Sequence, residues 1–263
     1  MSGMKSFYVQ VECDQFDSTE FTAGPWGPDT QHAGPPSALL TRAFEMYEPR
    51  ESTRLARVAV DILSPVPVDR LSVQTASVIS RRNVELLEGT VCAGGTTVLR
   101  GRAWRFSKAP TGIPAVGAQR TISPVPDQGT AKLPGAHMDG YMSVVDWRFA
   151  SGGFMQREPS SAWLRPRIPL LTQEELTPWQ RTMIVADSGS GVHMPLNPME
   201  TPTVNCDLVV TLDRDPVGDW IGLEAATTIV PDAGGTTNVR INDEDGVVGS
   251  SSQVLFIRSR TET

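Results

Sequence analysis

Few residues of the chain have the types and spacing that catalytic chemistry requires. The three histidines, His32, His137 and His193, show no metal-ligand spacing with cysteines or acidic residues. The run that begins at Ser188, Ser-Gly-Ser-Gly, is not the Gly-x-Ser-x-Gly elbow of serine hydrolases, because no strand directly precedes it. The sequence therefore predicts no metal site and no serine nucleophile of that kind. His32 precedes a predicted helix and could contact a ligand there, although a structural role is the alternative.

Charged residues offer a second kind of candidate site. Arg81 and Arg82, and Arg165 and Arg167, could bind the phosphates of a ligand, because guanidinium groups form paired hydrogen bonds with phosphate oxygens. Solvated surface charge is the alternative interpretation of both pairs. The paired glycines at 94–95 and 234–235 indicate hairpin turns rather than phosphate-binding loops.

The bulk properties exclude several classes of protein. The chain has 263 residues and a formal net charge of −7, with a pI of about 5.0, which argues against a general nucleic-acid binder. No apolar run has the length of a signal peptide or of a membrane span. Three scattered cysteines without CxxC spacing are typical of reduced thiols. We therefore expect a cytoplasmic protein.

The second half of the chain repeats a pattern of the first half. The segment at 58–73 resembles the segment at 207–223, and Pro67 aligns with Pro216 at an offset of 149 residues. The segment at 94–106 resembles the segment at 243–256 at nearly the same offset, 150 residues for Val98 and Val248. Two matching segments at one offset predict a duplicated fold unit, with chance similarity between amphipathic strands as the alternative.

Each repeat is predicted to contain a helix and an antiparallel meander. In the first, apolar residues from Leu39 to Tyr47 lie on one helical face, and prolines 35 and 36 suit the helix start. In the second, Thr177 and Pro178 provide an N-cap and a first residue for a helix over 178–187. The expected strands are 7–13, 55–63, 69–80, 83–93, 96–107, 142–149, 162–168, 203–213, 219–230, 235–241 and 247–259. The Pro- and Gly-rich segment between the halves predicts a first unit at 1–110, a linker at 111–140 and a second unit at 141–263.

This pattern resembles the α+β double hotdog fold of the acyl-CoA thioesterases, and most closely the acyl-CoA thioesterase II type. The matching segments are Gln31-His-Ala-Gly-Pro-Pro-Ser-Ala-Leu-Leu, Ala186-Asp-Ser, the segment 202–216 with the following Asp219-Trp, and Asp245-Gly-Val-Val-Gly-Ser-Ser-Ser-Gln. The sequence departs from the family where His32-Ala-Gly replaces a Gly-Gly pair, and in the looser Gly-Ser-Gly run after Asp187. The resemblance covers most of the chain except the linker.

The resemblance implies a site in the second hotdog unit that holds a water molecule. Its Asp falls on Asp187, its middle polar residue on Asn205, with Thr203 as the alternative, and its Gln on Gln253. The first repeat has Ala103 in place of Gln253, so one site per duplicated unit is expected. Asp187 would take a proton from water as it attacks the thioester carbonyl, while the two amides orient that water.

The same resemblance implies an acyl-CoA substrate, no cofactor and a homodimer. His32 and Gly34 at the first helix start are expected to contact substrate, with backbone N–H groups there stabilising the oxyanion. Two alternatives stay open. One is a non-catalytic acyl-CoA- or lipid-binding hotdog protein. The other is a hydratase or dehydratase, which would require His32 or His193 close to Asp187.

Overall fold

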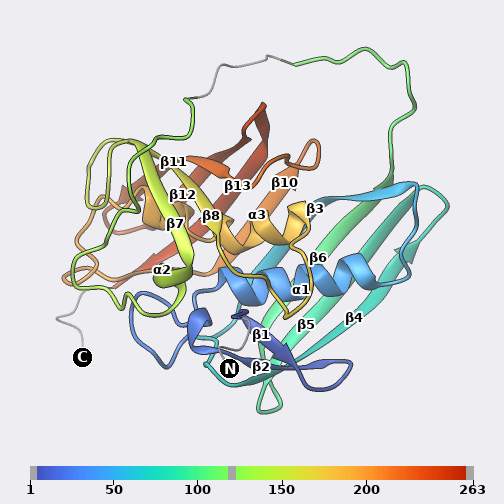
Figure 1. Ribbon diagram of the computed structural model, residues 1–263, viewed down its shortest axis with the longest axis horizontal. Helices are drawn as coiled ribbons and strands as arrows, with labels where there is room; N and C mark the ends of the chain where they lie inside the picture. Colours follow the sequence, from blue (N-terminus) through green and yellow to red (C-terminus); the bar gives the residue numbers. More distant parts are fainter. Residues whose placement is uncertain (1–4, 118–122, 259–263) are drawn as a thin grey trace.

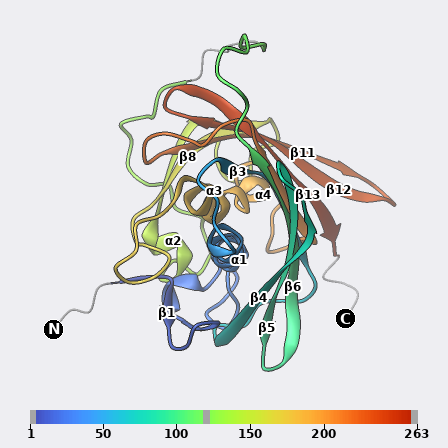
Figure 2. The same ribbon diagram turned by 90° about the vertical axis from the view of Figure 1, so that its right-hand side faces the viewer.

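The computed structural model describes residues 5–117 and 123–258, and shows two units that each pack a helix on an antiparallel sheet (Figure 1). The thirteen strands within these ranges form one continuous sheet. The helices α1 (Gly34–Met46) and α3 (Pro178–Ala186) contact each other on the same side of that sheet, as Figure 2 shows from the end. Twelve strands follow one another in the order β1-β2-β4-β5-β6-β3-β10-β13-β12-β11-β8-β7, and β9 pairs with β13.

The predicted helices and most predicted strands are confirmed within a few residues. The first unit contains β1 (Tyr8–Gln10), β2 (Gln15–Ser18), β3 (Thr53–Ile62), β4 (Arg70–Ser80), β5 (Val84–Ala93) and β6 (Thr96–Ser107). The second contains β7 (Val145–Ser151), β8 (Ser160–Pro166), β9 (Thr203–Asn205), β10 (Asp207–Leu212), β11 (Ile221–Val230), β12 (Gly234–Asp243) and β13 (Gly246–Ile257). Sequence reasoning missed β2, the short helices α2 (Tyr141–Val144) and α4 (Gly189–Val192), and the separation of β9 from β10.

The prediction of a simple meander is wrong for the first of the four strands in each meander, β3 and β10. β3 pairs with β6 rather than with β4, and β10 pairs with β13 rather than with β11. The link from β3 to β4 spans residues 63–69 and contains Pro65 and Pro67. A link of this length and composition does not form a tight hairpin, for which loops of about two to five residues are usual. The first strand of each predicted meander, β3 or β10, therefore lies beside its last strand, β6 or β13.

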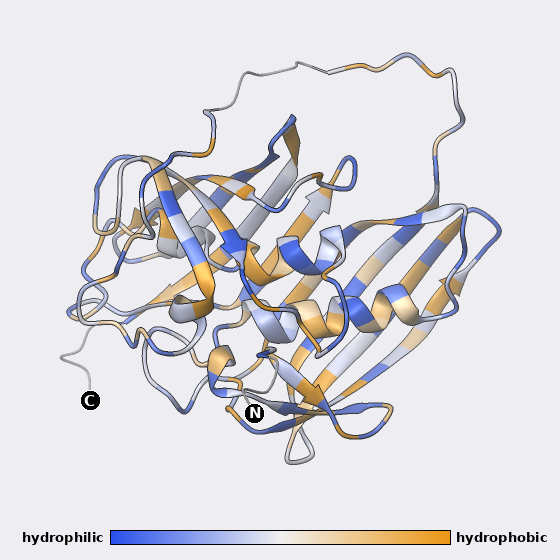
Figure 3. Cartoon of the chain, in the orientation of Figure 1, coloured by the Kyte–Doolittle hydropathy of each residue, from blue (hydrophilic) through white to orange (hydrophobic). Residues whose placement is uncertain are grey.

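The duplication is visible in the strand boundaries. β5 and β12 begin and end 150 residues apart, and so do β6 and β13. The two repeats meet where β3 pairs antiparallel with β10, with Val58 opposite Val210. This pairing places equivalent strands symmetrically about the centre of the sheet, in the order β4-β5-β6-β3 and β10-β13-β12-β11. Along the strands hydrophilic and hydrophobic residues alternate (Figure 3), because one sheet face is covered by the helices.

The two helices pack differently on their sheets. In the first unit Leu40 of α1 lies against Gly89 and Gly101, where an added Cβ would come within 2.9 Å and 2.8 Å of the leucine methyl groups. The equivalent positions 150 residues later are Val239 and Ser251, which are larger. There α3 ends, and a second short helix starts at Gly189, where an added Cβ would come within 2.7 Å of Val239. The helical path is thus interrupted beside Asp187 in the second unit and continuous in the first.

No helix in the described ranges has the length and apolar character needed to cross a membrane.

Candidate active site

Asp187, the residue after the last turn of α3, is the centre of a polar cluster. Its carboxylate Oδ1 accepts hydrogen bonds from Asn205 Nδ2 at 2.5 Å and from Gln253 Nε2 at 3.3 Å. Gln253 Nε2 also donates to the main-chain oxygen of Asp187 at 3.0 Å, and Gln253 Oε1 accepts from the Ser190 N–H. The end of α3, the short strand β9 and the strand β13 thus bring together the three residues that the resemblance singled out.

His32 approaches Asp187 from the other unit. Its Nδ1 lies 3.1 Å from Asp187 Oδ2, and its Nε2 lies 3.3 Å from Ser188 Oγ. The ring stacks on Tyr141, with ring centroids 3.8 Å apart. Burial lowers the pKa of His32 below 6.5, while the negative charge of Asp187 acts in the opposite direction. Because burial is the larger effect, the imidazole is neutral at pH 7.

Gly34 has a packing role that its sequence position did not reveal. A Cβ added there would lie 2.1 Å from the main-chain oxygen of Ile184, so only glycine allows α1 to approach α3 this closely. Its N–H donates to His32 Nδ1 at 3.1 Å. The Gly34 N–H is therefore already engaged in a hydrogen bond to His32. The neighbouring residue Ala33 lines the cavity beside Asp187, and its N–H has no partner among the hydrogen bonds of the described residues.

A cavity of about 470 Å³ opens beside Asp187 and Asn205. Gln253 is almost fully buried and lies behind Asp187, outside the cavity lining. Thr203 also lines the cavity, but Asn205 is the residue on β9 that donates to Asp187. The cavity has an apolar interior formed by Val66, Leu133, Met142, Trp147, Phe154 and Met194. Such a lining with a few polar groups at one place is typical of a small-molecule site.

The mouth of this cavity carries exposed apolar side chains and one cation. Trp26 and Phe256 are each 56% exposed although both line the cavity. Arg258 lines it as well, and together with Trp26 also lines a neighbouring hollow of about 480 Å³ that contains His137. Sequence reasoning did not single out Trp26 or Arg258, because neither belongs to a motif.

The other sequence candidates lie elsewhere. His193 Nδ1 accepts from the Thr227 N–H at 2.7 Å, and its Nε2 contacts the Arg157 main-chain oxygen, so it has a structural role. Arg165 and Arg167 both pair with Asp146 and do not line the cavity of Asp187. The side chains of Arg81 and Arg82 are exposed. These arginines fit the alternative of surface charge better than a phosphate site next to Asp187.

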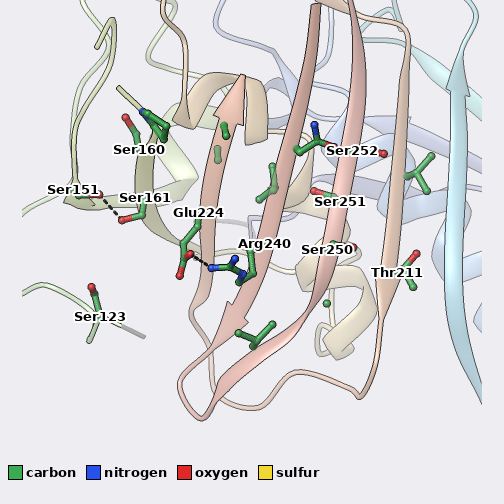
Figure 4. A pocket seen from close by; sticks show the side chains of 18 of the residues that line it. Ser123, Ser151, Ser160, Ser161, Thr211, Glu224, Arg240, Ser250, Ser251 and Ser252 are labelled. Atoms are coloured by element: carbon green, nitrogen blue, oxygen red, sulfur yellow. Dashed lines mark hydrogen bonds and ion pairs between the residues drawn. The ribbon is translucent and has the colours of Figure 1, made fainter. Parts of the chain in front are cut away.

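A larger hollow of about 1040 Å³ lies over the outer face of the sheet in the second unit (Figure 4). Hydroxyl side chains line it, and its central Arg240 is paired with Glu224 at 2.6 Å. Ser250 and Ser252 belong to this face, whereas Gln253 points to the helix side of β13. The hollow has neither the apolar chamber nor the converging polar side chains found beside Asp187. The smaller cavity is therefore the candidate active site.

Comparison with known proteins decides the family. Residues 22–106 match the family model of the acyl-CoA thioesterase N-terminal domain, and residues 120–257 match that of the acyl-CoA thioesterase C-terminal domain. The chain belongs to the acyl-CoA thioesterase family. The match covers both repeats, so the resemblance seen in the sequence is confirmed. No protein of curated function matches the chain.

Solved structures confirm the double hotdog fold of this family member. A conserved protein with a hot dog fold from Alicyclobacillus acidocaldarius is similar over 95% of each chain, at 14% identity and a TM-score of 0.75. A candidate thioesterase II from Thermobifida fusca YX is similar at 16% identity and a TM-score of 0.73, over 98% of this chain and 99% of that chain. The acyl-CoA thioesterase II TesB2 from Mycobacterium marinum is similar at 12% identity and 0.66, over 97% and 96%.

Proposed function

We propose that the chain hydrolyses fatty acyl-CoA thioesters to free fatty acid and coenzyme A, with Asp187 activating the attacking water. The observation that carries the proposal is the convergence of Asn205, Gln253 and His32 on the Asp187 carboxylate, beside an apolar cavity. Within an acyl-CoA thioesterase family member, such a carboxylate fits the role of general base.

The contacts suggest a different role for each residue of the site. The side-chain amide of Gln253 donates from Nε2 to Asp187 and accepts at Oε1 from the Ser190 N–H. Gln253 therefore holds Asp187 in place. Asp187 and Asn205 line the cavity, and these two residues would hold the water. Asp187 takes one proton as the oxygen adds to the thioester carbonyl carbon. The carbon–sulfur bond then breaks, and the proton passes from Asp187 to the departing thiolate.

The developing oxyanion needs a donor close to the water site. We propose the N–H of Ala33, a residue that lines the cavity at the start of α1. The positive end of the helix dipole also favours negative charge at this position. The apolar interior would take the acyl chain. The mouth with Trp26 and Arg258 would face the coenzyme A portion, where an arginine can pair with a phosphate.

Hydrolysis of an acyl-CoA panel from short to long chains, followed by release of free thiol, tests the proposal. We expect turnover by the wild-type chain and a loss of about 10²- to 10⁴-fold in kcat for Asp187→Ala, the range typical of a positioned base. Full activity of Asp187→Ala would contradict the mechanism. Tight binding of acyl-CoA without turnover would instead support a non-catalytic binding protein.

One contact supports a second candidate function. A hydratase or dehydratase would require a histidine close to Asp187, and His32 Nδ1 lies 3.1 Å from its carboxylate. Addition of water to a 2-enoyl thioester would consume its conjugated double bond. Loss of the enoyl absorbance without release of free thiol would favour this activity, whereas thiol release with the double bond intact would exclude it as the main reaction.

Two features stay predictions: a cytoplasmic location and a homodimer. Fractionation of cells that express the chain, and light scattering of the purified protein, test them.

A further inference from the structure

Two buried hydroxyl groups connect the imidazole of His32 to the backbone of α3. The Tyr141 hydroxyl lies 3.0 Å from the main-chain oxygen of Ile184 and 2.9 Å from Ser188 Oγ. Ser188 Oγ in turn lies 3.3 Å from His32 Nε2. Tyr141 and Ser188 are both buried. The chain of contacts thus runs from a peptide carbonyl to one nitrogen of the ring, on the side of the ring opposite Asp187.

The direction of these hydrogen bonds follows from the main-chain oxygen of Ile184, with which the chain of contacts begins. A peptide carbonyl can only accept, so Tyr141 must donate its single proton to Ile184. The Ile184 oxygen depends on this bond, because the Ser188 N–H, its expected helical partner, donates to Val185 instead. Burial raises the pKa of Tyr141, so its hydroxyl keeps the proton. Ser188 must then donate to Tyr141, and Ser188 Oγ is left to accept from His32 Nε2.

The other ring nitrogen gives the same result independently. The Gly34 N–H donates to His32 Nδ1 at 3.1 Å, which requires a lone pair on Nδ1. The neutral ring therefore carries its proton on Nε2 in every arrangement that keeps all of these bonds. The opposite tautomer would lose the bond from Gly34 to His32 and one of the three bonds that link Ile184, Tyr141, Ser188 and His32, and would gain one bond from Nδ1 to Asp187.

We infer that Tyr141 and Ser188 are positioning residues that hold the proton of His32 on Nε2, so that the Nδ1 lone pair faces Asp187 Oδ2. The inference rests on the proposed function only in its consequence for catalysis. Once the Asp187 carboxylate has taken a proton from water, it can donate that proton to Nδ1, whose single lone pair is then shared between Asp187 and the Gly34 N–H. His32 thus stabilises the protonated carboxyl group after the attack, until the proton passes to the thiolate.

The same arrangement separates the two candidate functions. A ring whose N–H points to Ser188 has no proton to offer to a substrate carbon in the cavity. His32 therefore supports Asp187 as a base and does not itself act as a general acid. The stacking of the ring on Tyr141, with an interplanar angle of 2°, holds the imidazole plane fixed while the proton moves on the side of Asp187.

Nitrogen-15 NMR of the ligand-free protein at pH 7 tests the inference, because the two tautomers give different patterns of ring correlations. His32→Gln identifies the His32 signals among those of the three histidines. We expect a protonated Nε2 and an unprotonated Nδ1. A protonated Nδ1 with a bare Nε2 in the wild type would overturn the inference without use of any variant.

Tyr141→Phe keeps the ring stack and removes the hydroxyl. Ser188 can then donate to Nε2, and only the Gly34 bond still favours the Nε2–H form. We therefore expect the Nδ1–H form to gain population, with kcat lowered about tenfold and KM changed less than twofold. Tyr8→Phe is the matched control, because it removes another buried phenol, which bonds to Gln31 rather than to Ser188. It should leave the His32 tautomer unchanged. A folded Tyr141→Phe protein in which the Nδ1–H form gains no population would refute the inference.

The NMR measurement of the His32 tautomer does not depend on the proposed function. The tautomer is measured without substrate, so a chain that hydrolyses no acyl-CoA can still show it. Equally, hydrolysis that depends on Asp187 can occur with the opposite tautomer.

Discussion

Three side chains contact the Asp187 carboxylate. Asn205 and Gln253 donate amide protons to one carboxylate oxygen, and His32 faces the other. These residues come from the loop before α1, the end of α3 and two strands, so the site forms only when both units are folded. At the residue scale, the sequence resemblance identified Asp187, Asn205 and Gln253. Sequence reasoning placed His32 near a ligand but could not place it against Asp187, since they are 155 residues apart in sequence.

The buried neutral His32 predicts how stability depends on pH. Burial lowers its pKa in the folded state below 6.5, so the unfolded chain binds more protons as the pH falls through 6.5. This contribution to stability is fully present above that value and is lost as the pH falls towards the folded-state pKa. Urea unfolding at pH 7.5 and 5.5 should therefore show a larger loss of stability on acidification for the wild type than for His32→Gln. An equal loss in both proteins would contradict this prediction.

At the scale of elements, the approach of α1 to α3 brings the two halves of the site together. Gly34 packs against the main chain at Ile184, and the end of α1 is tied to the start of α3 by Glu45, which accepts from Thr177 and Gln180. Burial raises the pKa of Glu45, against the effect of these donors. The helix faces and N-cap could be predicted from the sequence. The glycine contact could not, because it joins elements far apart in the chain.

Gly34→Ala should separate the helices. The added methyl group has no room beside the Ile184 oxygen, and overpacking of this kind costs about 1–3 kcal/mol in the free energy of unfolding. We also expect kcat to fall, because His32 would move away from Asp187. Ser37→Ala, one turn later in α1, is the control: its hydroxyl is buried without a partner among the described residues, so its loss should cost little. Urea unfolding and acyl-CoA hydrolysis provide the two measurements. Equal stability of the two variants would contradict the packing argument.

At the scale of the whole molecule, the two units are joined by more contacts along their shared boundary, here called the seam, than by the segment of chain that connects them. β3 and β10 pair across it, and Arg42 with Glu174 and Arg54 with Asp215 form ion pairs from one unit to the other. Residues 108–117 of the connecting segment are exposed throughout. The repeat and the double hotdog fold could be predicted from the sequence. The pairing of β3 with β10 could not, since alternating strands show which face is buried but not which neighbour they meet.

Cutting the connection should leave the molecule assembled. A protease site inserted between Gly112 and Ile113 lies in an exposed stretch, and after cleavage we expect both fragments to elute together with hydrolysis changed less than twofold. The same experiment tests the predicted division into units at 1–110 and 141–263. Separation of the fragments without denaturant would show that the covalent connection, rather than the β3–β10 seam and the α1–α3 contact, holds the units together.

Incorporation of oxygen-18 in a single turnover tests the central claim most directly. Excess enzyme is mixed with acyl-CoA in labelled water, and mass spectrometry follows the fatty acid and the peptide that contains Asp187. If Asp187 activates water as a base, the label enters the fatty acid in the first turnover and the peptide stays unlabelled. Label in Asp187, with an unlabelled fatty acid, would show that the carboxylate attacks the thioester itself and would contradict the account.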